Sequence, residues 1–379
     1  MDRKPHDFTL DFLRILSAIL VLLSHFATYA ATSASVTSGK DAAFGFLSAF
    51  AGLGAAGVAT LFVISGFAIA MSASRGGGVS AALRFARIRA TRILPALWVS
   101  AIVSLGARAF YGEDFRALVM DVARSAVLSP KGPYVDGVVW SLVVQAVFYL
   151  LVAVCVMSKF RLSIYDLARL IGLSSSAYLL VLSGLHLAPS SAGAEDAIAV
   201  LSRFPFKLLL LQHGVFFASG MVFFVASNQD RGPRPSYMTM TILFATFSTM
   251  GVVEILINLD SPGEHTYIAV SIYIFLLSTM ILGKLRDQTI GKRIGMCGDI
   301  VRYMGRVSYA IYLNHYALGM VMVWVLFRRG LSAQAVFVVS VTLVLIVSAG
   351  VSWLDRKIQN AITGRVARPA SGAAKLAAM

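Results

Sequence analysis

The sequence predicts an all-α protein that crosses a membrane many times, and three observations carry this prediction. Hydrophobic residues make up 58% of the 379 residues and charged residues 13%, whereas a soluble domain carries about 25% charged residues. The mean hydropathy is +0.78. Apolar runs of membrane-spanning length recur along the whole chain. Helix is the expected state, because helices satisfy their own backbone in lipid and these runs lack the alternation of a β-barrel.

The apolar runs define one transmembrane domain. We expect about ten transmembrane helices, at residues 9–30, 44–72, 93–111, 137–157, 167–187, 207–227, 237–258, 266–284, 307–327 and 332–354. No segment between them is long enough for a folded soluble domain. We therefore expect a transmembrane domain over residues 1–355 with no appended soluble domain. Residues 356–379 are rich in small and basic residues, which predicts a short disordered cytoplasmic tail.

The formal charge of +15 is explained by topology. If the N-terminus is cytoplasmic, the cytoplasmic segments hold 23 lysines and arginines and the outside segments hold 9. This bias predicts that both termini are cytoplasmic. The charge therefore requires no nucleic acid, and contact with anionic membrane lipids is consistent with it. Cys155 and Cys297 have neither a disulfide pattern nor a metal-ligand spacing, so we expect no metal site.

Two ionisable residues, Arg14 and His25, lie inside the first apolar segment. Eleven helical steps of about 100° bring them within roughly 20° of three full turns, so both share one helix face. At 1.5 Å per residue they stand roughly 16 Å apart, about half of the hydrocarbon thickness. Snorkelling of Arg14 and packing of His25 would be the plain interpretation. Together on one face they indicate a shared site, in which Arg14 holds an anion and His25 exchanges a proton.

Four arginines between residues 84 and 92 precede the third apolar segment. Positive-inside topology explains Arg84 and Arg87. Arg89 and Arg92 share a face at i, i+3 if this stretch is helical. Guanidinium groups bind phosphate oxygens bidentately. Arg89 and Arg92 are therefore candidates for binding a phosphate-bearing cofactor at the cytoplasmic side.

Polar side chains also mark two later segments. Ser141, Gln145 and Tyr149 recur at i, i+4 and i+8 and form one stripe, which either lines a cavity or joins neighbouring helices. His315 falls about two turns inside the segment 307–327. A packed histidine and a functional one are equally consistent with that position.

In this order, the segments resemble the acyltransferase 3 family of bacterial membrane O-acyltransferases. The resemblance rests on the Asp-x-x-Arg stretch and its histidine (Asp11, Arg14 and His25), on residues 61–67, on Arg89 and Arg92 followed by Ile-Leu-Pro, and on residues 305–315. It covers residues 9 to about 327. One position departs from the family pattern: Gln145 stands where the family usually has glutamate, and glutamine can neither carry charge nor take a proton.

The resemblance implies an enzyme of the bacterial inner membrane. Such an enzyme moves an acyl group, commonly acetyl, from cytoplasmic acyl-coenzyme A to a hydroxyl of an envelope saccharide or lipid-linked glycan. We expect Arg14, Arg89 and Arg92 to hold the phosphates of the coenzyme and His25 to act as general base. His315 and Tyr149 are expected to orient groups or to stabilise the oxyanion. A covalent route through Ser141 is the less favoured mechanism, because no histidine neighbours it in sequence.

Two other functions remain open from the sequence. A transporter or flippase for a lipid-linked or acidic solute would use the same intramembrane charges as a pathway. A family member with weakened catalysis is also consistent with Gln145. The acceptor, the length of the acyl chain and the oligomeric state are not determined by these patterns.

Overall fold

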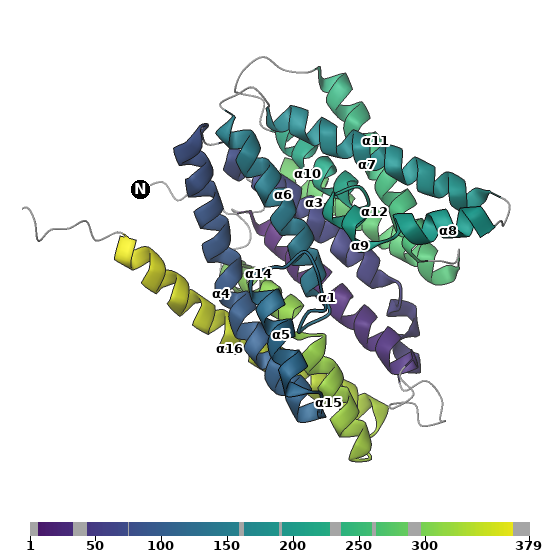
Figure 1. Ribbon diagram of the computed structural model, residues 1–379, viewed down its shortest axis with the longest axis vertical. Coiled ribbons are helices and arrows are strands. Elements are labelled where there is room, and N and C mark those ends of the chain that lie inside the picture. Colours follow the sequence, from purple (N-terminus) through teal and green to yellow (C-terminus); the bar gives the residue numbers. More distant parts are fainter. Residues whose placement is uncertain are drawn as a thin grey trace, which may run out of the picture.

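The computed structural model describes residues 7–32, 44–74, 76–158, 163–188, 192–227, 236–259, 263–286 and 297–366. These residues are helical in almost every segment and contain no strand (Figure 1). The helices are α1 (Phe8–Thr32), η1 (Gly45–Phe50), α3 (Leu53–Ala73), α4 (Val79–Tyr111), α5 (Phe115–Ala126), α6 (Val139–Met157), α7 (Ile164–Leu187), α8 (Ala192–Leu201), α9 (Phe204–Leu208), α10 (Gly214–Ser227), α11 (Tyr237–Asn258), α12 (Glu264–Leu285), α14 (Cys297–Asn314), α15 (Ala317–Arg328) and α16 (Ala333–Val366).

The all-α, multi-pass architecture is confirmed. Within the described ranges, eight helices are long and apolar enough to cross a membrane alone, and they match eight of the predicted segments. The predicted span 307–327 is instead a broken pair, in which α14 and α15 are bent by 65°. The predicted span 207–227 holds only the short apolar helix α10. In both cases a helix begins or ends at a buried residue: α10 begins at Gly214 and α14 ends at Asn314.

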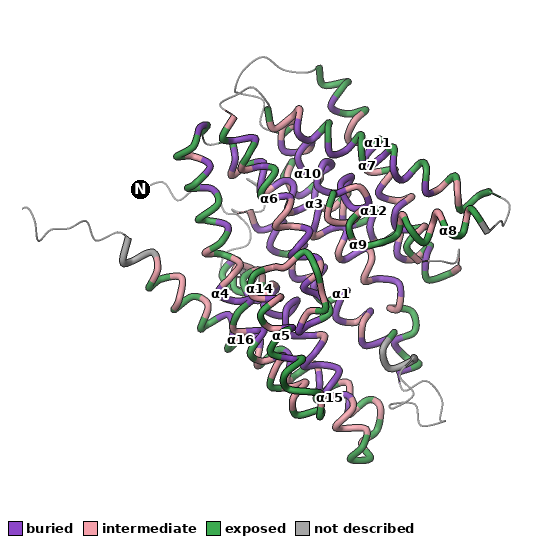
Figure 2. The backbone as a smooth tube through the Cα atoms, viewed as in Figure 1, coloured by how far each residue is buried: buried purple, intermediate pink, exposed green. Residues whose placement is uncertain are grey.

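The short helix α10 lies in the centre of the bundle. All residues from Gly214 to Val222 are buried, so α10 is enclosed by protein (Figure 2). Gly220 and Gly66 allow its close approach to α3, because a Cβ at either position would collide with the backbone of the other helix. A helix that is surrounded by protein needs no full membrane-spanning length.

The remaining helices form two groups. One contains α3, α7, α10, α11 and α12, and the other contains α4, α5, α14, α15 and α16. Helix α1 packs against α3 and α12 of the first group and against α14 and α15 of the second. Helix α6 likewise packs against α3 and α7 and against α4. The two helices with the most prominent polar positions therefore lie at the junction of the two groups.

The C-terminal boundary differs from the prediction. Helix α16 continues to Val366, so residues 356–366, predicted to be part of a disordered tail, are helical. Their local contacts explain this: Gln359 donates to the Asp355 carboxylate at i, i+4, at 2.8 and 2.9 Å, and the Lys357 ammonium lies over the Trp353 ring. The rest of the predicted tail lies outside the described residues.

Candidate active site

Helix α1 presents Arg14 and His25 as the sequence predicts. It is a continuous helix through both positions, so their separation of roughly 16 Å along the axis holds. The Arg14 guanidinium is held by the buried carboxylate of Asp11, with Nη1 and Oδ1 2.8 Å apart. The Asp-x-x-Arg spacing is thus an i, i+3 ion pair within one helix turn.

The predicted arginines converge at one end of this axis. Helix α4 runs without interruption through residues 89 and 92, so both share the predicted face. The Tyr149 hydroxyl lies within electrostatic range of Arg14, Arg89 and Arg92. Arg14 and Arg92 are also close enough to repel each other. Guanidinium groups from two helices therefore lie near the Tyr149 hydroxyl of a third helix, an arrangement that an anion would stabilise.

The neighbouring acids do not neutralise this cluster completely. Asp11 pairs with Arg14, and Asp355 of α16 interacts electrostatically with Arg92. Arg89 is 9% exposed, and its guanidinium reaches the Ala68 carbonyl and covers the Phe85 ring. Asp7 also interacts electrostatically with Arg14, but it pairs with Lys284 at 2.7 Å, so four cations and three carboxylates leave an excess of positive charge. This cluster of Arg14, Arg89, Arg92 and Tyr149 is called the arginine cluster below.

At the other end of the axis, His25 forms a pair with His315. His25 Nδ1 and His315 Nε2 are 2.8 Å apart, and the two rings stack with centroids 5.0 Å apart. His315 Nδ1 lies 2.9 Å from the Tyr312 carbonyl oxygen, which can only accept. When His315 is neutral its proton is therefore on Nδ1, and its Nε2 accepts from His25 Nδ1. The tautomer of His25 that results has its free lone pair on Nε2, where a general base needs it.

The break between α14 and α15 positions this pair. His315 and Tyr316 occupy the break, and His315 is fully buried. The first free backbone N–H of α15, that of Ala317, donates to the Asp136 carboxylate at 3.0 Å, and Ser104 donates to the same oxygen. Asp136 thus caps the second half of a broken helix, because it accepts from a backbone N–H that the break leaves without a helical partner.

Asp136 lies in the segment before α6, outside the spans, and gives a pH-dependent prediction. Burial raises its pKa from 3.8 to about 6, although backbone N–H groups and Ser104 donate to it. Between about pH 4 and 6, Asp136 is therefore protonated in the folded protein and ionised in the unfolded chain. Stability is then highest below about pH 4 and falls, by at most about 3 kcal/mol, as the pH rises to about 6.

Thermal unfolding in detergent at a series of pH values measures this effect. We expect the wild-type Tm to fall between about pH 4 and 7 and Asp136→Asn to flatten that slope. Asp196→Asn, at an exposed carboxylate of α8, is the matched control and should retain the wild-type slope. An unchanged slope in Asp136→Asn would show that another group is responsible.

The polar stripe of α6 is present, but its members have different partners. The Ser141 hydroxyl donates to the Val138 carbonyl at 2.9 Å and lies 2.7 Å from the Tyr312 hydroxyl. Because each hydroxyl has one proton, Tyr312 donates to Ser141. The bonds of Ser141 thus involve no histidine, which argues against a role as nucleophile. Tyr149 donates to the Gln145 side-chain oxygen at 2.9 Å.

The position of Gln145 leads to a second prediction. His25 Nδ1 contacts His315, and the His25 ring also hydrogen-bonds the Val21 backbone, whereas Gln145 bonds Tyr149 beside the arginine cluster. The orientation of the His25 ring therefore does not depend on a carboxylate at 145. We expect Gln145→Glu to change kcat by less than about threefold, because a tyrosine–carboxylate bond replaces a tyrosine–amide bond. Steady-state kinetics measure this; a gain of two orders of magnitude would mean that Gln145 impairs the native enzyme.

Sequence reasoning missed Asp136, Tyr312 and Tyr316. Tyr316 packs its ring edge against His25, with centroids 5.0 Å apart. None of the three has a spacing signal, because their partners are distant in sequence or depend on the helix break. His213 and Glu254 form a buried pair with Nδ1 and Oε1 2.8 Å apart. That pair joins α10 to α11, within the first helix group.

Comparison with known proteins places this arrangement in a family. No curated protein and no solved structure matches the chain. The model of the acyltransferase 3 family, described as an acyltransferase domain, matches residues 7–354. This match includes all helices that carry the arginine cluster and the histidine pair. The chain therefore belongs to the acyltransferase 3 family and is a multi-pass membrane acyltransferase.

Proposed function

We propose that the protein is an O-acyltransferase of a bacterial inner membrane. It would take an acyl group, in the first place acetyl, from cytoplasmic acyl-coenzyme A. It would transfer that group to a hydroxyl of an envelope saccharide or lipid-linked glycan. The observation that carries the proposal is the contact of His25 with His315, which leaves Nε2 of His25 free as a base.

The arginine cluster supports the choice of donor. Acyl-coenzyme A carries several phosphates, and the excess positive charge at Arg14, Arg89 and Arg92 suits them. The axial distance of roughly 16 Å to His25 is comparable to an extended pantetheine arm. Phosphates held by the arginine cluster would thus bring the thioester close to the histidine pair. The distribution of lysines and arginines predicts that this end of α1 faces the cytoplasm, where the proposed donor is found.

The proposed reaction is a direct transfer. His25 Nε2 accepts the proton of the acceptor hydroxyl while the oxygen attacks the thioester carbonyl carbon. The tetrahedral intermediate collapses, the carbon–sulfur bond breaks, and the proton on His25 passes to the departing thiolate. His315 keeps its bond to His25 Nδ1–H throughout, so it fixes the ring and stabilises the transient imidazolium, as the third group of a catalytic triad does. No residue is acylated on this route.

Family membership favours transfer over transport, and a chemical analysis of the envelope tests it. Mass spectrometry and proton NMR of glycans from wild-type, deletion and His25→Ala strains measure the ester content. We expect esters to be present in wild type and lost in the other two strains. His186→Ala is the control, since this histidine bonds the Leu182 carbonyl within its own helix turn. Esters that persist in the deletion strain would refute glycan acylation; esters that persist in His25→Ala alone would refute only the base.

A further inference from the structure

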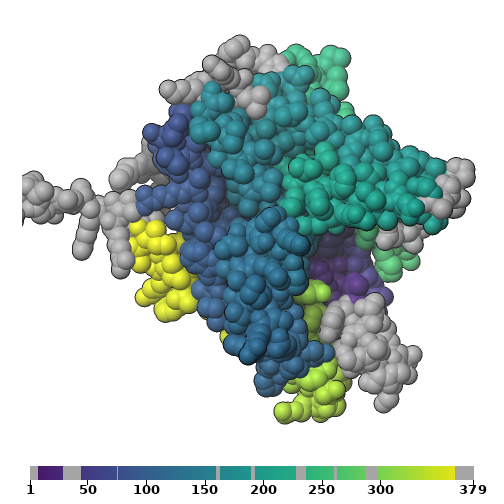
Figure 3. Space-filling model, viewed as in Figure 1, coloured from purple at the N-terminus to yellow at the C-terminus, as the bar shows by residue number. Residues whose placement is uncertain are grey.

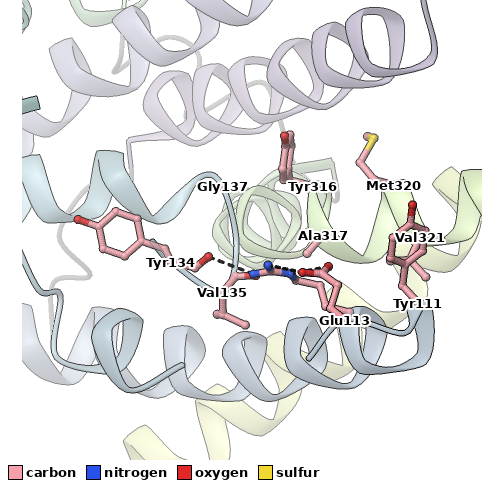
Figure 4. Close-up of a pocket in the computed structure, with 10 residues that line it drawn as sticks. Tyr111, Glu113, Tyr134, Val135, Gly137, Tyr316, Ala317, Met320 and Val321 are labelled. Carbon is pink, nitrogen blue, oxygen red and sulfur yellow. Dashed lines mark hydrogen bonds and ion pairs between the residues drawn. The ribbon is translucent and has the colours of Figure 1, made fainter. Parts of the chain in front are cut away.

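A cavity of about 290 Å³ lies beside the histidine pair, between the end of α4, the segment before α6 and α15. Its lining includes Tyr111, Glu113, Gly137, Tyr316 and Met320 (Figure 4). On the face seen in Figure 3, the blue segment that contains α4 and α5 lies beside lime-coloured α15 in the lower part of the molecule. The volume is at the lower end of the range of small-molecule sites. It suits a ligand of one or two rings.

Tyr316 connects this cavity to the base. Its ring lines the cavity and also meets His25 edge-on, with centroids 5.0 Å apart. Gly137 makes this position possible, because a Cβ there would lie 2.7 Å from the Tyr316 ring. A ligand in the cavity is therefore separated from His25 by one aromatic ring. The cavity lies on the outer side in the predicted topology, opposite the arginine cluster.

The charged groups of the cavity favour a ligand whose hydroxyl groups donate hydrogen bonds. Arg108 is largely engaged: it donates to both Glu113 oxygens, at 2.9 and 2.6 Å, to Asp121 and to the carbonyls of Tyr134 and Val135. These bonds use Nε–H, both Nη1–H groups and one Nη2–H, and the carboxylates of Glu113 and Asp121 balance the charge of Arg108, which disfavours binding of an anion. The Glu113 carboxylate is 35% exposed, and its oxygens have lone pairs beyond the two that Arg108 uses. The polar capacity that remains is that of the Glu113 oxygens, which accept from O–H groups, and of one Arg108 Nη2–H, which can donate to a hydroxyl oxygen.

The aromatic side chains of the cavity favour a ligand that contains a ring with apolar faces. Tyr111 and Tyr316 contribute ring surface to the cavity, and Met320 adds an apolar contact. Tyr111 is held by Trp324, with centroids 4.6 Å apart. The negative face of an aromatic ring attracts polarised C–H groups, which line the faces of a pyranose. A ligand that has apolar ring faces and hydroxyl donors and carries no charge is a neutral sugar.

We propose that this cavity binds a pyranose unit of the acceptor, with Glu113 accepting from its hydroxyls and Tyr111 and Tyr316 packing on its faces. The inference rests on the proposed function, since it assigns the acceptor site of that reaction. The donor and the acceptor then approach the histidine pair from opposite ends of α1.

Kinetics with separate titration of the two substrates test the assignment. Purified protein in lipid nanodiscs transfers radiolabelled acetyl from acetyl-CoA to glycan extracted from the deletion strain. We expect Glu113→Gln and Tyr111→Ala to raise KM for the glycan about tenfold, while KM for acetyl-CoA stays within twofold. Glu195→Gln, at an exposed carboxylate of α8, is the control and should match wild type. A rise in KM for acetyl-CoA instead, or no change in KM for the glycan, overturns the assignment.

A binding measurement without turnover separates the two proposals. Methyl pyranosides of glucose, galactose and N-acetylglucosamine are titrated into His25→Ala protein while tryptophan fluorescence is recorded. Trp324 neighbours the cavity, so we expect saturable quenching in the millimolar range that Trp324→Phe removes. Quenching without acetyl transfer by wild type overturns the proposed function and with it the acceptor role. Transfer by wild type without quenching by any pyranoside overturns the cavity assignment and leaves the function intact.

Discussion

Replacing His315 with alanine is expected to lower kcat/KM by roughly 10²-fold, in the range of general-base contributions. The substitution removes the acceptor for His25 Nδ1–H, and the ring is then free to rotate and to change tautomer. His315→Gln should recover part of the loss, because an amide oxygen can accept the same bond. Rates of ester formation in nanodiscs, measured at saturating acetyl-CoA, check both expectations.

The double variant distinguishes positioning from folding. If His315 acts through His25, the effects of His25→Ala and His315→Ala are not additive, and the double variant is no slower than His25→Ala. His315 is fully buried, so each variant is also assessed by its Tm. Full activity of His315→Ala would refute the pair. Additive losses together with a lowered Tm would assign His315 a structural role instead.

Arg92→Gln is expected to raise KM for acetyl-CoA by roughly 10- to 100-fold. Charge-assisted hydrogen bonds contribute about 1.5–3 kcal/mol each, and Arg92 interacts electrostatically with Arg14, Tyr149 and Asp355. Glutamine keeps hydrogen-bonding capacity but removes the charge that phosphates need. The effect is measured from CoA release at varied acetyl-CoA concentration.

A truncated donor provides the matched comparison for Arg92. Acetyl-pantetheine carries the thioester without the phosphates, so wild type and Arg92→Gln should use it with equal kcat/KM. Arg87→Gln is the control, since Arg87 is exposed one turn earlier on α4. A loss on acetyl-pantetheine as large as that on acetyl-CoA would show that Arg92 does not act on the phosphates.

Most of the helices could be predicted because each is a local pattern. Eight predicted segments match single helices, since a run of apolar residues needs no information from distant positions. The break after Asn314 could not be predicted in this way. Residues 307–327 contain no proline, and the second half is capped by Asp136, 181 positions away. The short helix α10 depends in the same way on tight packing against α3.

The candidate site likewise contains some features that helical periodicity predicts and others that depend on contacts between distant residues. The shared face of Arg14 and His25, the spacing of Arg89 and Arg92, and the bond between Gln145 and Tyr149 follow from helical periodicity. The contact of His25 with His315 joins residues 290 positions apart. No spacing rule links them, and the orientation of the base, which the departure at Gln145 left open, became clear only from their proximity.

The long sequence separations in the site have a consequence for synthesis and insertion. Arg14, Arg89 and Arg92 are all made early, so a nascent chain could gather the arginine cluster before most helices exist. The histidine pair needs α14, and the capped break needs Asp136 together with Ala317. A chain halted before residue 315 would therefore carry the arginines proposed to bind the donor but an unpaired His25. On the proposed mechanism, acyl-coenzyme A held by such an intermediate would meet no oriented base, so transfer would begin only when the last part of the bundle is in place.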